Sequence, residues 1–314
     1  MISNPDSHKP GQISIGVLNI AHRGARAFAP ENTLAAFEKS ITFGCQMFEI
    51  DVRMSKDGEL IIHHDDQLTR CTDVKSKFPG RSSYFFSDFT YDELYVLDAG
   101  SWYVEQLSLP VSQRQDFLQT LTGEELAQFV SSRDTACYES GAIKLPTLKQ
   151  TLEFAKDADL MVNIEIKTQA QMDAGLAKAI VKLVEFMGCE QRVLISSFDH
   201  EQLVKVRQLT KNIATGILTS DPLPNPDEYL QSLDAEAYNL GCYREFDAMG
   251  FNTLEGKLYL SGINKVRKSG YGVNVWTCND KEEMRQLIAA GITGLISDYP
   301  NRVRDVLAEL SSPS

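Results

Sequence analysis

The chain alternates short apolar runs with longer runs in which apolar residues recur every three or four positions, from about residue 17 to its end. The short runs are typical of strands and the longer ones of amphipathic helices. Strands are predicted in nine places: 17–22, 47–53, 59–64, 160–167, 192–198, 213–218, 237–241, 272–277 and 293–298. Helices are predicted between them, including 31–44, 147–157, 172–188 and 281–291.

The second and third predicted strands are close enough in sequence to form a hairpin. A parallel connection needs at least about a dozen residues, and far fewer separate these two runs. Asp57 and Gly58 lie between them and indicate a tight turn, so we expect an antiparallel pair. The other eight strands alternate with helices, which predicts an α/β fold, a TIM (β/α)8 barrel. Active sites of such barrels lie at the C-terminal ends of the strands.

One long connection interrupts this alternation. Residues 66 to about 145 are too many for a plain link between a strand and a helix, and they predict an inserted subdomain or lid on a single domain spanning 14–314. Thr122 and Glu125 have the spacing of a capping box and predict a helix within 121–132. Several aromatic residues of the insertion could wall a substrate pocket or pack a small core of their own: Phe85, Phe86, Tyr91, Trp102 and Tyr103.

Composition argues against several classes of partner. The formal net charge is −12, with no block of Lys or Arg, which disfavours nucleic acid and anionic membrane surfaces but leaves room for a small anionic substrate beside local cations. No apolar run reaches membrane-span length, and residues 1–13 lack signal-peptide features, so we expect a disordered tail, no stable membrane association and a cytoplasmic protein. The six scattered cysteines predict buried, reduced thiols rather than a zinc site or disulfides.

Three carboxylates are candidate metal ligands. Glu49 and Asp51 are two residues apart in a strand, so their side chains point to the same face. Glu165 alternates with apolar residues near the end of another strand and faces the same way. Carboxylates buried together repel one another unless a cation lies between them. Arg or Lys could neutralise them structurally, but their convergence favours a hard cation such as Mg²⁺ or Ca²⁺.

Two histidines are candidates for proton transfer. His22 lies at the end of the first predicted strand, and His63 and His64 lie at the end of the third. A pair of imidazoles at one rim can act as general base and general acid near neutral pH. Strand periodicity leaves open which of His63 and His64 faces the site.

Two cationic residues stand beside these groups. Arg23 follows His22, and Lys167 follows Glu165 with the same parity. A guanidinium and an ammonium near a divalent cation suit a phosphoryl group. A charge-balanced network without a ligand is the alternative.

Eight short segments, in this order along the chain, carry a resemblance to a known family: AHRGARAFAPENTLAAF, FEIDVRMSKDGELIIHHDDQLTR, LDAGSWY, LPTL, NIEIK, ISSF, VNVWTCN and GLISDYP. From about residue 17 to 303 the chain resembles the glycerophosphodiester phosphodiesterase family, within the phosphatidylinositol phospholipase C-like TIM-barrel phosphodiesterases. The resemblance implies a barrel with a small insertion that hydrolyses glycerophosphodiesters to an alcohol and sn-glycerol 3-phosphate.

The resemblance also implies roles for the candidate residues. It implies one divalent cation, Mg²⁺ or Ca²⁺, an acid/base pair of His22 and His64 rather than His63, metal ligands at Glu49, Asp51 and Glu165, and phosphate contacts at Arg23 and Lys167. Phe198 and Trp276 resemble pocket walls, although packing at the barrel rim would also explain them.

The stretch 106–140 is longer than the family commonly has, which leaves the alcohol side of the substrate open. A lysophospholipase D-type activity, with the insertion as a hydrophobic cap, and a barrel that binds a phosphodiester without cleaving it are the alternatives.

Overall fold

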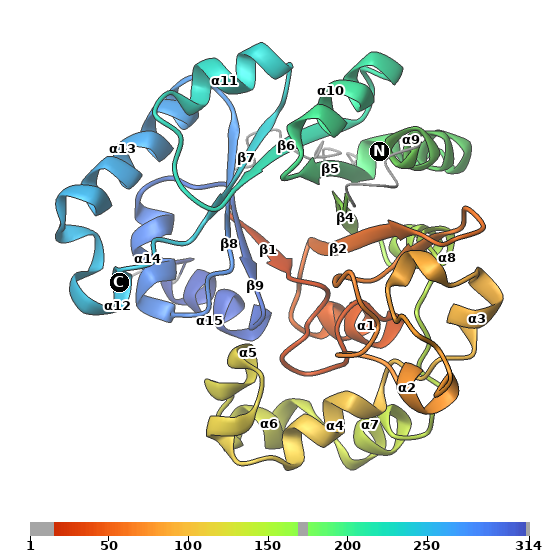
Figure 1. The fold of residues 1–314 in the computed structure, drawn as a ribbon. Helices are drawn as coiled ribbons and strands as arrows, with labels where there is room; N and C mark the ends of the chain where they lie inside the picture. Colours follow the sequence, from red (N-terminus) through yellow and green to blue (C-terminus); the bar gives the residue numbers. More distant parts are fainter. Residues whose placement is uncertain (1–15, 169–174, 312–314) are drawn as a thin grey trace, which may run out of the picture.

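The computed structural model describes residues 16–168 and 175–311, so the predicted tail at 1–13 and the start of the helix predicted at 172–188 lie outside the described residues. Eight parallel strands form a closed barrel, because β1 pairs with both β2 and β9 (Figure 1). Their bounds are β1 Leu18–Ala21, β2 Met47–Met54, β4 Met161–Ile166, β5 Val193–Ser197, β6 Ala214–Thr219, β7 Ala237–Gly241, β8 Gly272–Trp276 and β9 Gly294–Ser297. The TIM-barrel prediction is confirmed.

Helices connect these strands around the outside of the barrel (Figure 1). They are α1 Leu34–Thr42, α8 Leu148–Asp157, α9 Leu176–Met187, α10 His200–Leu209, α11 Pro226–Leu233, α13 Leu254–Lys268, α14 Lys281–Ala289 and α15 Pro300–Ser311, with the short elements η3 Glu190–Arg192, α12 Phe246–Met249 and η4 Gly250–Asn252. Local sequence fixes several of their starts. Thr147, for example, forms a capping box with Gln150 at the start of α8.

Strand periodicity separates an apolar outer face from a polar inner one. In β2, the side chains of Phe48, Ile50 and Val52 are fully buried in the core between the barrel and its helices. The ring of Phe48 stacks on Phe37 of α1 at 4.5 Å between centroids. The alternate residues of β2 include Glu49, which therefore faces the barrel interior. The period of two thus places carboxylates inside the barrel.

The predicted hairpin is present. β3, Leu60–Ile62, pairs antiparallel with β2, and Gly58 in the turn has a φ of +93° that favours glycine. β3 ends two residues earlier than the predicted run at 59–64. The Arg53 guanidinium donates a hydrogen bond of 3.0 Å to the His64 carbonyl, which holds the chain where it leaves the strand.

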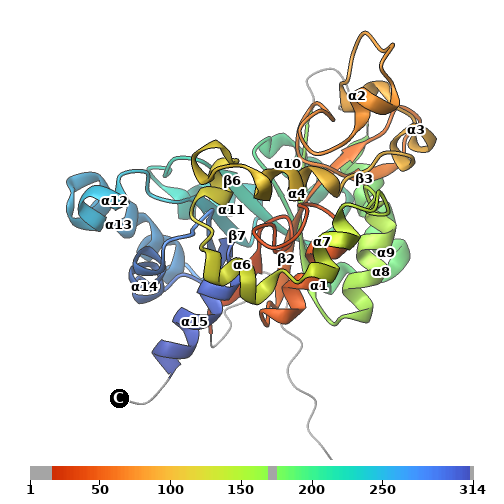
Figure 2. The same cartoon turned by 90° about the horizontal axis from the view of Figure 1, so that it is seen from below.

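The first part of the inserted segment has a small core of its own. It comprises α2 Val74–Lys77, η1 Phe86–Asp88 and α3 Tyr91–Tyr95, and it projects beyond the barrel (Figure 2). The buried side chains of this part pack together with β3, and they include Leu68, Val74, Phe86 and Phe89.

The second part of the inserted segment packs against the barrel. It comprises α4 Ser101–Ser108, η2 Val111–Gln113, α5 Asp116–Gln119, α6 Gly123–Phe129 and α7 Ser132–Tyr138, which lie below α1 and α15 in Figure 1. The Tyr103 hydroxyl donates to the Ala27 carbonyl at 2.7 Å, and the Tyr299 hydroxyl donates to the Phe117 carbonyl at 2.5 Å. Trp102 and Tyr103 are buried in the main core, so packing explains them.

One carboxylate joins the inserted segment to α15. Glu125 forms the predicted capping box with Thr122 at the start of α6. It also accepts hydrogen bonds of 2.8 Å from Nε and Nη2 of Arg302 and one of 3.0 Å from Asn301. Burial alone would raise the pKa of Glu125, but the hydrogen bonds from Arg302 and Asn301 outweigh it and lower the pKa to about 2.

Glu125→Gln should lower the free energy of unfolding at neutral pH by about 1–2 kcal/mol, because it removes the charge from these hydrogen bonds. The pKa is lowered on folding, so the contribution is fully present above the ordinary value of 4.5 and is lost as the pH falls towards about 2. Urea denaturation of both proteins across this range measures the difference.

Glu124→Gln is the matched control, because Glu124 is an exposed neighbour on the same helix. It should leave stability unchanged. If the free energies of unfolding of wild type and Glu125→Gln differ as much near the acid limit of this pH range as at neutral pH, the charge of Glu125 does not have the stabilising role given to it.

Candidate active site

A cavity of about 160 Å³ opens at the C-terminal ends of the barrel strands. Eight of the nine predicted site residues line it: His22, Arg23, Glu49, His64, Glu165, Lys167, Phe198 and Trp276. Asp51 does not reach the cavity wall, and its side chain is buried against Lys167. The structure therefore brings the predicted residues to one place, while their roles stay predictions.

A tight turn after β1 positions the first two of them. Arg23 and Gly24 have positive φ values of 54° and 74°. A Cβ on Gly24 would come within 2.7 Å of the backbone of Ala36, so the turn can approach α1 only with glycine here. This conformation aims the Arg23 amide at Glu49, where it donates a hydrogen bond of 2.9 Å.

Glu49, Asp51 and Glu165 form a buried cluster with carboxylate oxygens within 4.8 Å of one another. The ammonium of Lys167 lies 3.1 Å from Asp51 and 2.6 Å from Glu165. Asn32, whose φ is also positive, donates a hydrogen bond of 2.7 Å to Asp51. One ammonium and one amide thus hold part of the cluster in place.

Lys167 pairs with Asp51 and Glu165, and Glu49 is the carboxylate of the cluster that it does not contact. Burial, with the charges of Asp51 and Glu165, raises its pKa well above the ordinary range. Its Oε1 is buried and has no hydrogen-bond partner among the described residues. An unpaired carboxylate oxygen beside two further carboxylates is a set of hard donors, which fits a divalent cation of the Mg²⁺ or Ca²⁺ type.

His22 is held by a carboxylate that the sequence analysis did not single out. Its Nδ1 lies 2.7 Å from Oδ1 of Asp298, one residue beyond β9, and its Nε2 lies 3.9 Å from Glu49. Burial, followed by the charge of Arg26, lowers the pKa of His22 to about 4. The imidazole is therefore neutral at neutral pH, with Nδ1 donating to Asp298 and Nε2 left as the acceptor.

His64 reaches the cavity from the stretch that directly follows β3. Its Nδ1 lies 2.6 Å from Asp65, which accepts a hydrogen bond of 2.5 Å from Arg70. The side chain of His64 is 30% exposed, in contrast to the buried His22. The two histidines therefore differ in their access to water.

His63 points away from the cavity. Its ring stacks on Phe86 at 5.5 Å between centroids, and its Nε2 lies 3.2 Å from the Gln67 carbonyl. The structure thus answers the question that strand periodicity left open: His64 faces the site, and His63 packs in the core of the inserted segment.

Sequence reasoning missed a second layer of charged residues. Arg26 lines the cavity and donates to both oxygens of Asp298. Glu31 is buried and accepts from Arg23 at 3.0 Å and from Arg70 at 2.6 Å. Asp298 follows the last strand, so its place at a strand end could have identified it. Arg26 and Glu31 lie in the loop after β1, where strand parity gives no information.

Phe198 and Trp276 form an aromatic wall of the cavity. Their rings are T-shaped at 5.3 Å between centroids, and the Trp276 indole donates to the Asn239 carbonyl at 3.0 Å. Phe198 is 45% exposed, so it is not explained by packing alone. The aromatic residues of the inserted segment named above are absent from the lining of this cavity.

A TIM barrel with two imidazoles and three carboxylates around one cavity at its strand ends has the architecture of a barrel enzyme. Comparison with known proteins identifies the family. The Glycerophosphoryl diester phosphodiesterase family model matches residues 22–302, and the chain belongs to this family.

Individual relatives match along nearly the whole chain. A glycerophosphodiester phosphodiesterase from Caldanaerobacter subterraneus subsp. tengcongensis is 30% identical over 90% of this chain and 94% of its own length. The structure of an Oleispira antarctica phosphodiesterase in complex with the product sn-glycerol-3-phosphate is similar with a TM-score of 0.69, at 25% identity, and the match covers 92% of this chain and 96% of that one. A glycerophosphodiester phosphodiesterase from Agrobacterium tumefaciens shares the fold, with a TM-score of 0.63, 21% identity and coverage of 91% and 98%.

The helices within residues 16–168 and 175–311 include none that combines the length and the hydropathy needed to cross a membrane.

Gly24→Ala should lower the free energy of unfolding by about 2–4 kcal/mol, because it adds a backbone clash to the strain of a positive φ. Gly44→Ala is the matched control, since Gly44 has a φ of +64° but open space where a Cβ would lie. It should cost only about 1 kcal/mol. Chemical denaturation measures both losses, and equal losses would show that the approach to Ala36 does not constrain the turn.

Proposed function

We propose that the protein hydrolyses glycerophosphodiesters to an alcohol and sn-glycerol 3-phosphate, with a divalent cation, Mg²⁺ or Ca²⁺, at Glu49, Asp51 and Glu165. The observation that carries the proposal is the convergence of His22, His64 and this buried carboxylate cluster on one cavity in a member of the family. The relative with sn-glycerol-3-phosphate bound supports the choice of product.

Cationic side chains of the cavity would bind the phosphodiester. Arg23, Arg26 and Lys167 all line it. The Arg23 guanidinium is held at the cavity by Asp51, 3.5 Å from its Nε, and by Glu31, 3.0 Å from its Nη1, so it is positioned to contact a phosphate oxygen. A chain with a net charge of −12 needs such a local concentration of cations to attract an anionic substrate.

A bound divalent cation would supply Lewis-acid stabilisation of the negative charge that develops at the phosphate. His22 is suited to act as general base, because its Nδ1–H donates a hydrogen bond to Asp298, which leaves Nε2 free to accept a proton from the attacking hydroxyl or water. His64 is suited to act as general acid towards the leaving alcohol, since its half-exposed ring lies at the mouth beside Asp65.

The residues around the mouth favour a small, polar alcohol over a lysophospholipid. A second depression of about 390 Å³ shares Arg23, Arg26 and His64 with the catalytic cavity. Asp65 and the inserted segment contribute the rest of its wall, which is mainly charged and polar: Asp65, Arg70, Gln115, Asp116 and Phe117. A hydrophobic cap would require an apolar wall here, and Phe117 is the one apolar residue among these five.

The first test is release of sn-glycerol 3-phosphate from glycerophosphocholine and glycerophosphoethanolamine. EDTA should abolish release, and Mg²⁺ or Ca²⁺ should restore it, because the carboxylate cluster needs a cation to balance its charge. A panel with acyl chains of increasing length should show falling rates. Full activity in EDTA would remove the metal from the proposal, and rates that rise with acyl length would favour the lysophospholipase D-type alternative.

Replacing either proposed proton-transfer residue, as in His22→Ala or His64→Ala, should lower kcat by about 10²–10⁴-fold. His63→Gln is the matched control, because His63 neighbours His64 but faces the core of the inserted segment. It should change kcat by less than a few-fold, even if stability falls. A well-folded His22→Ala or His64→Ala variant whose kcat lies within tenfold of the wild-type value would exclude that residue from proton transfer.

A further inference from the structure

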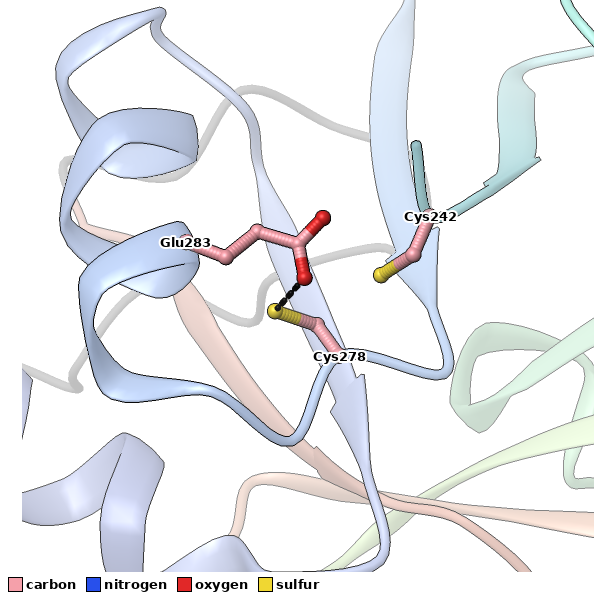
Figure 3. A group of neighbouring side chains, drawn as sticks. All are labelled: Cys242, Cys278 and Glu283. Atoms are coloured by element: carbon pink, nitrogen blue, oxygen red, sulfur yellow. Dashed lines mark hydrogen bonds between the residues drawn. The ribbon is translucent and has the colours of Figure 1, made fainter. Parts of the chain in front are cut away.

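A second group of side chains with metal-binding chemistry lies at the C-terminal ends of β7 and β8. Cys242 directly follows β7, Cys278 comes two residues after β8, and Glu283 lies in the first turn of α14. Figure 3 shows the two sulfur atoms and the carboxylate pointing toward one another. Because β7 and β8 are neighbouring parallel strands, their ends bring together two cysteines that are far apart in sequence.

The distances suit a tetrahedral metal. One ligand atom from each residue lies within 4.8 Å of the others, and Sγ of Cys278 lies 3.5 Å from Oε2 of Glu283. Bonds of about 2.3 Å to sulfur and 2.0 Å to oxygen, at tetrahedral angles, separate these two atoms by about 3.5 Å. The Cys278–Glu283 pair therefore already has the spacing that zinc requires.

Glu283 lacks a counterion. Its residue is 6% exposed, and its Oε1 is buried with no hydrogen-bond partner among the described residues. No Lys, Arg or His in residues 16–168 or 175–311 forms an ion pair with it. A buried carboxylate without a cation is costly, so its place beside two thiols requires an explanation.

Cys242 is the member of the group that borders a cavity. Cys242 lines a cavity of about 260 Å³ together with Tyr243 and Tyr259. The same cavity is lined by three carboxylates and one guanidinium: Asp221, Glu245, Glu255 and Arg244. The excess of negative charge favours the approach of a cation.

We propose that Cys242, Cys278 and Glu283 bind one thiophilic divalent cation, of which Zn²⁺ is the best match, with a water from the adjacent cavity as the fourth ligand. Two sulfur donors distinguish this site from the all-oxygen cluster of Glu49, Asp51 and Glu165, which suits harder ions. The two sites therefore select different metals and can be occupied together.

The zinc site has a structural role. It cross-links the ends of β7 and β8 to the start of α14, and so fixes the segment that begins at Trp276. Trp276 and Thr277 line the catalytic cavity, and the Thr277 hydroxyl lies 3.4 Å from Nδ1 of His22. Metal binding at Cys278 thus stabilises one wall of the active site without contacting substrate.

Cobalt(II) is the probe for the test, because a thiolate ligand gives it an intense charge-transfer absorption in the near ultraviolet that oxygen ligands do not. Untagged, full-length protein is reduced, stripped of metal with a chelator and titrated with Co²⁺. We expect the charge-transfer band to saturate at one equivalent and to disappear on addition of Zn²⁺. Zn²⁺ should also raise Tm by roughly 3–6 °C.

Cys278→Ser and Cys242→Ser should each weaken the band strongly and remove the gain in Tm, and Glu283→Gln should reduce both. Cys137→Ser is the matched control, because Cys137 is an exposed free thiol in α7, and it should behave as wild type. Cys242 is only half-buried, so its variant should fold even if Cys278→Ser does not.

Two outcomes would overturn the proposal. One is a folded, fully reduced wild type that shows no charge-transfer band with Co²⁺. The other is a band that survives in both Cys242→Ser and Cys278→Ser. Because the readout is absorption and Tm, neither outcome depends on whether the protein hydrolyses glycerophosphodiesters.

Discussion

The burial of three carboxylates within 4.8 Å of one another is the constraint on which the rest of the active site depends. In a low-dielectric interior this arrangement is unstable without positive charge. The surrounding structure supplies part of that charge through Lys167, through the amide of Arg23 and through Asn32. Two of these three residues have positive φ values, so the backbone itself is bent to deliver donors to the cluster. These groups compensate Glu49 least, and a bound cation would balance its negative charge.

The barrel and most of its site could be predicted because both follow from short-range periodicity. A period of two in β2 puts Glu49 and Asp51 on one face, and the same rule applies to Glu165. The rule fails where the strand ends, which is why periodicity could not choose between His63 and His64: both lie beyond β3. The conformations of loops and the packing of the inserted segment depend on tertiary contacts, and those are not encoded in local pattern.

Cys242 and Cys278 show the same limit of prediction from local sequence pattern. Spacing along the chain argued against a zinc site, because Cys242 and Cys278 belong to no local motif. Strand pairing places them together, and α14 adds Glu283 from a third segment. Local sequence motifs do not reveal a set of metal ligands that comes from three separate elements. In the structure, the buried carboxylate without a counterion draws attention to this set.

The hydrogen bond between His22 and Asp298 joins residues at opposite ends of the barrel sequence. β1 and β9 must pair before these two side chains can meet, so the imidazole acquires its orientation only with the last strand. During synthesis, the ribosome has to release nearly the whole chain before that strand can dock. A partly synthesised chain could bury much of its core and still be unable to orient its first histidine. A correctly oriented His22 would then appear only once the ring of strands has closed, and no shorter fragment of the chain would have it.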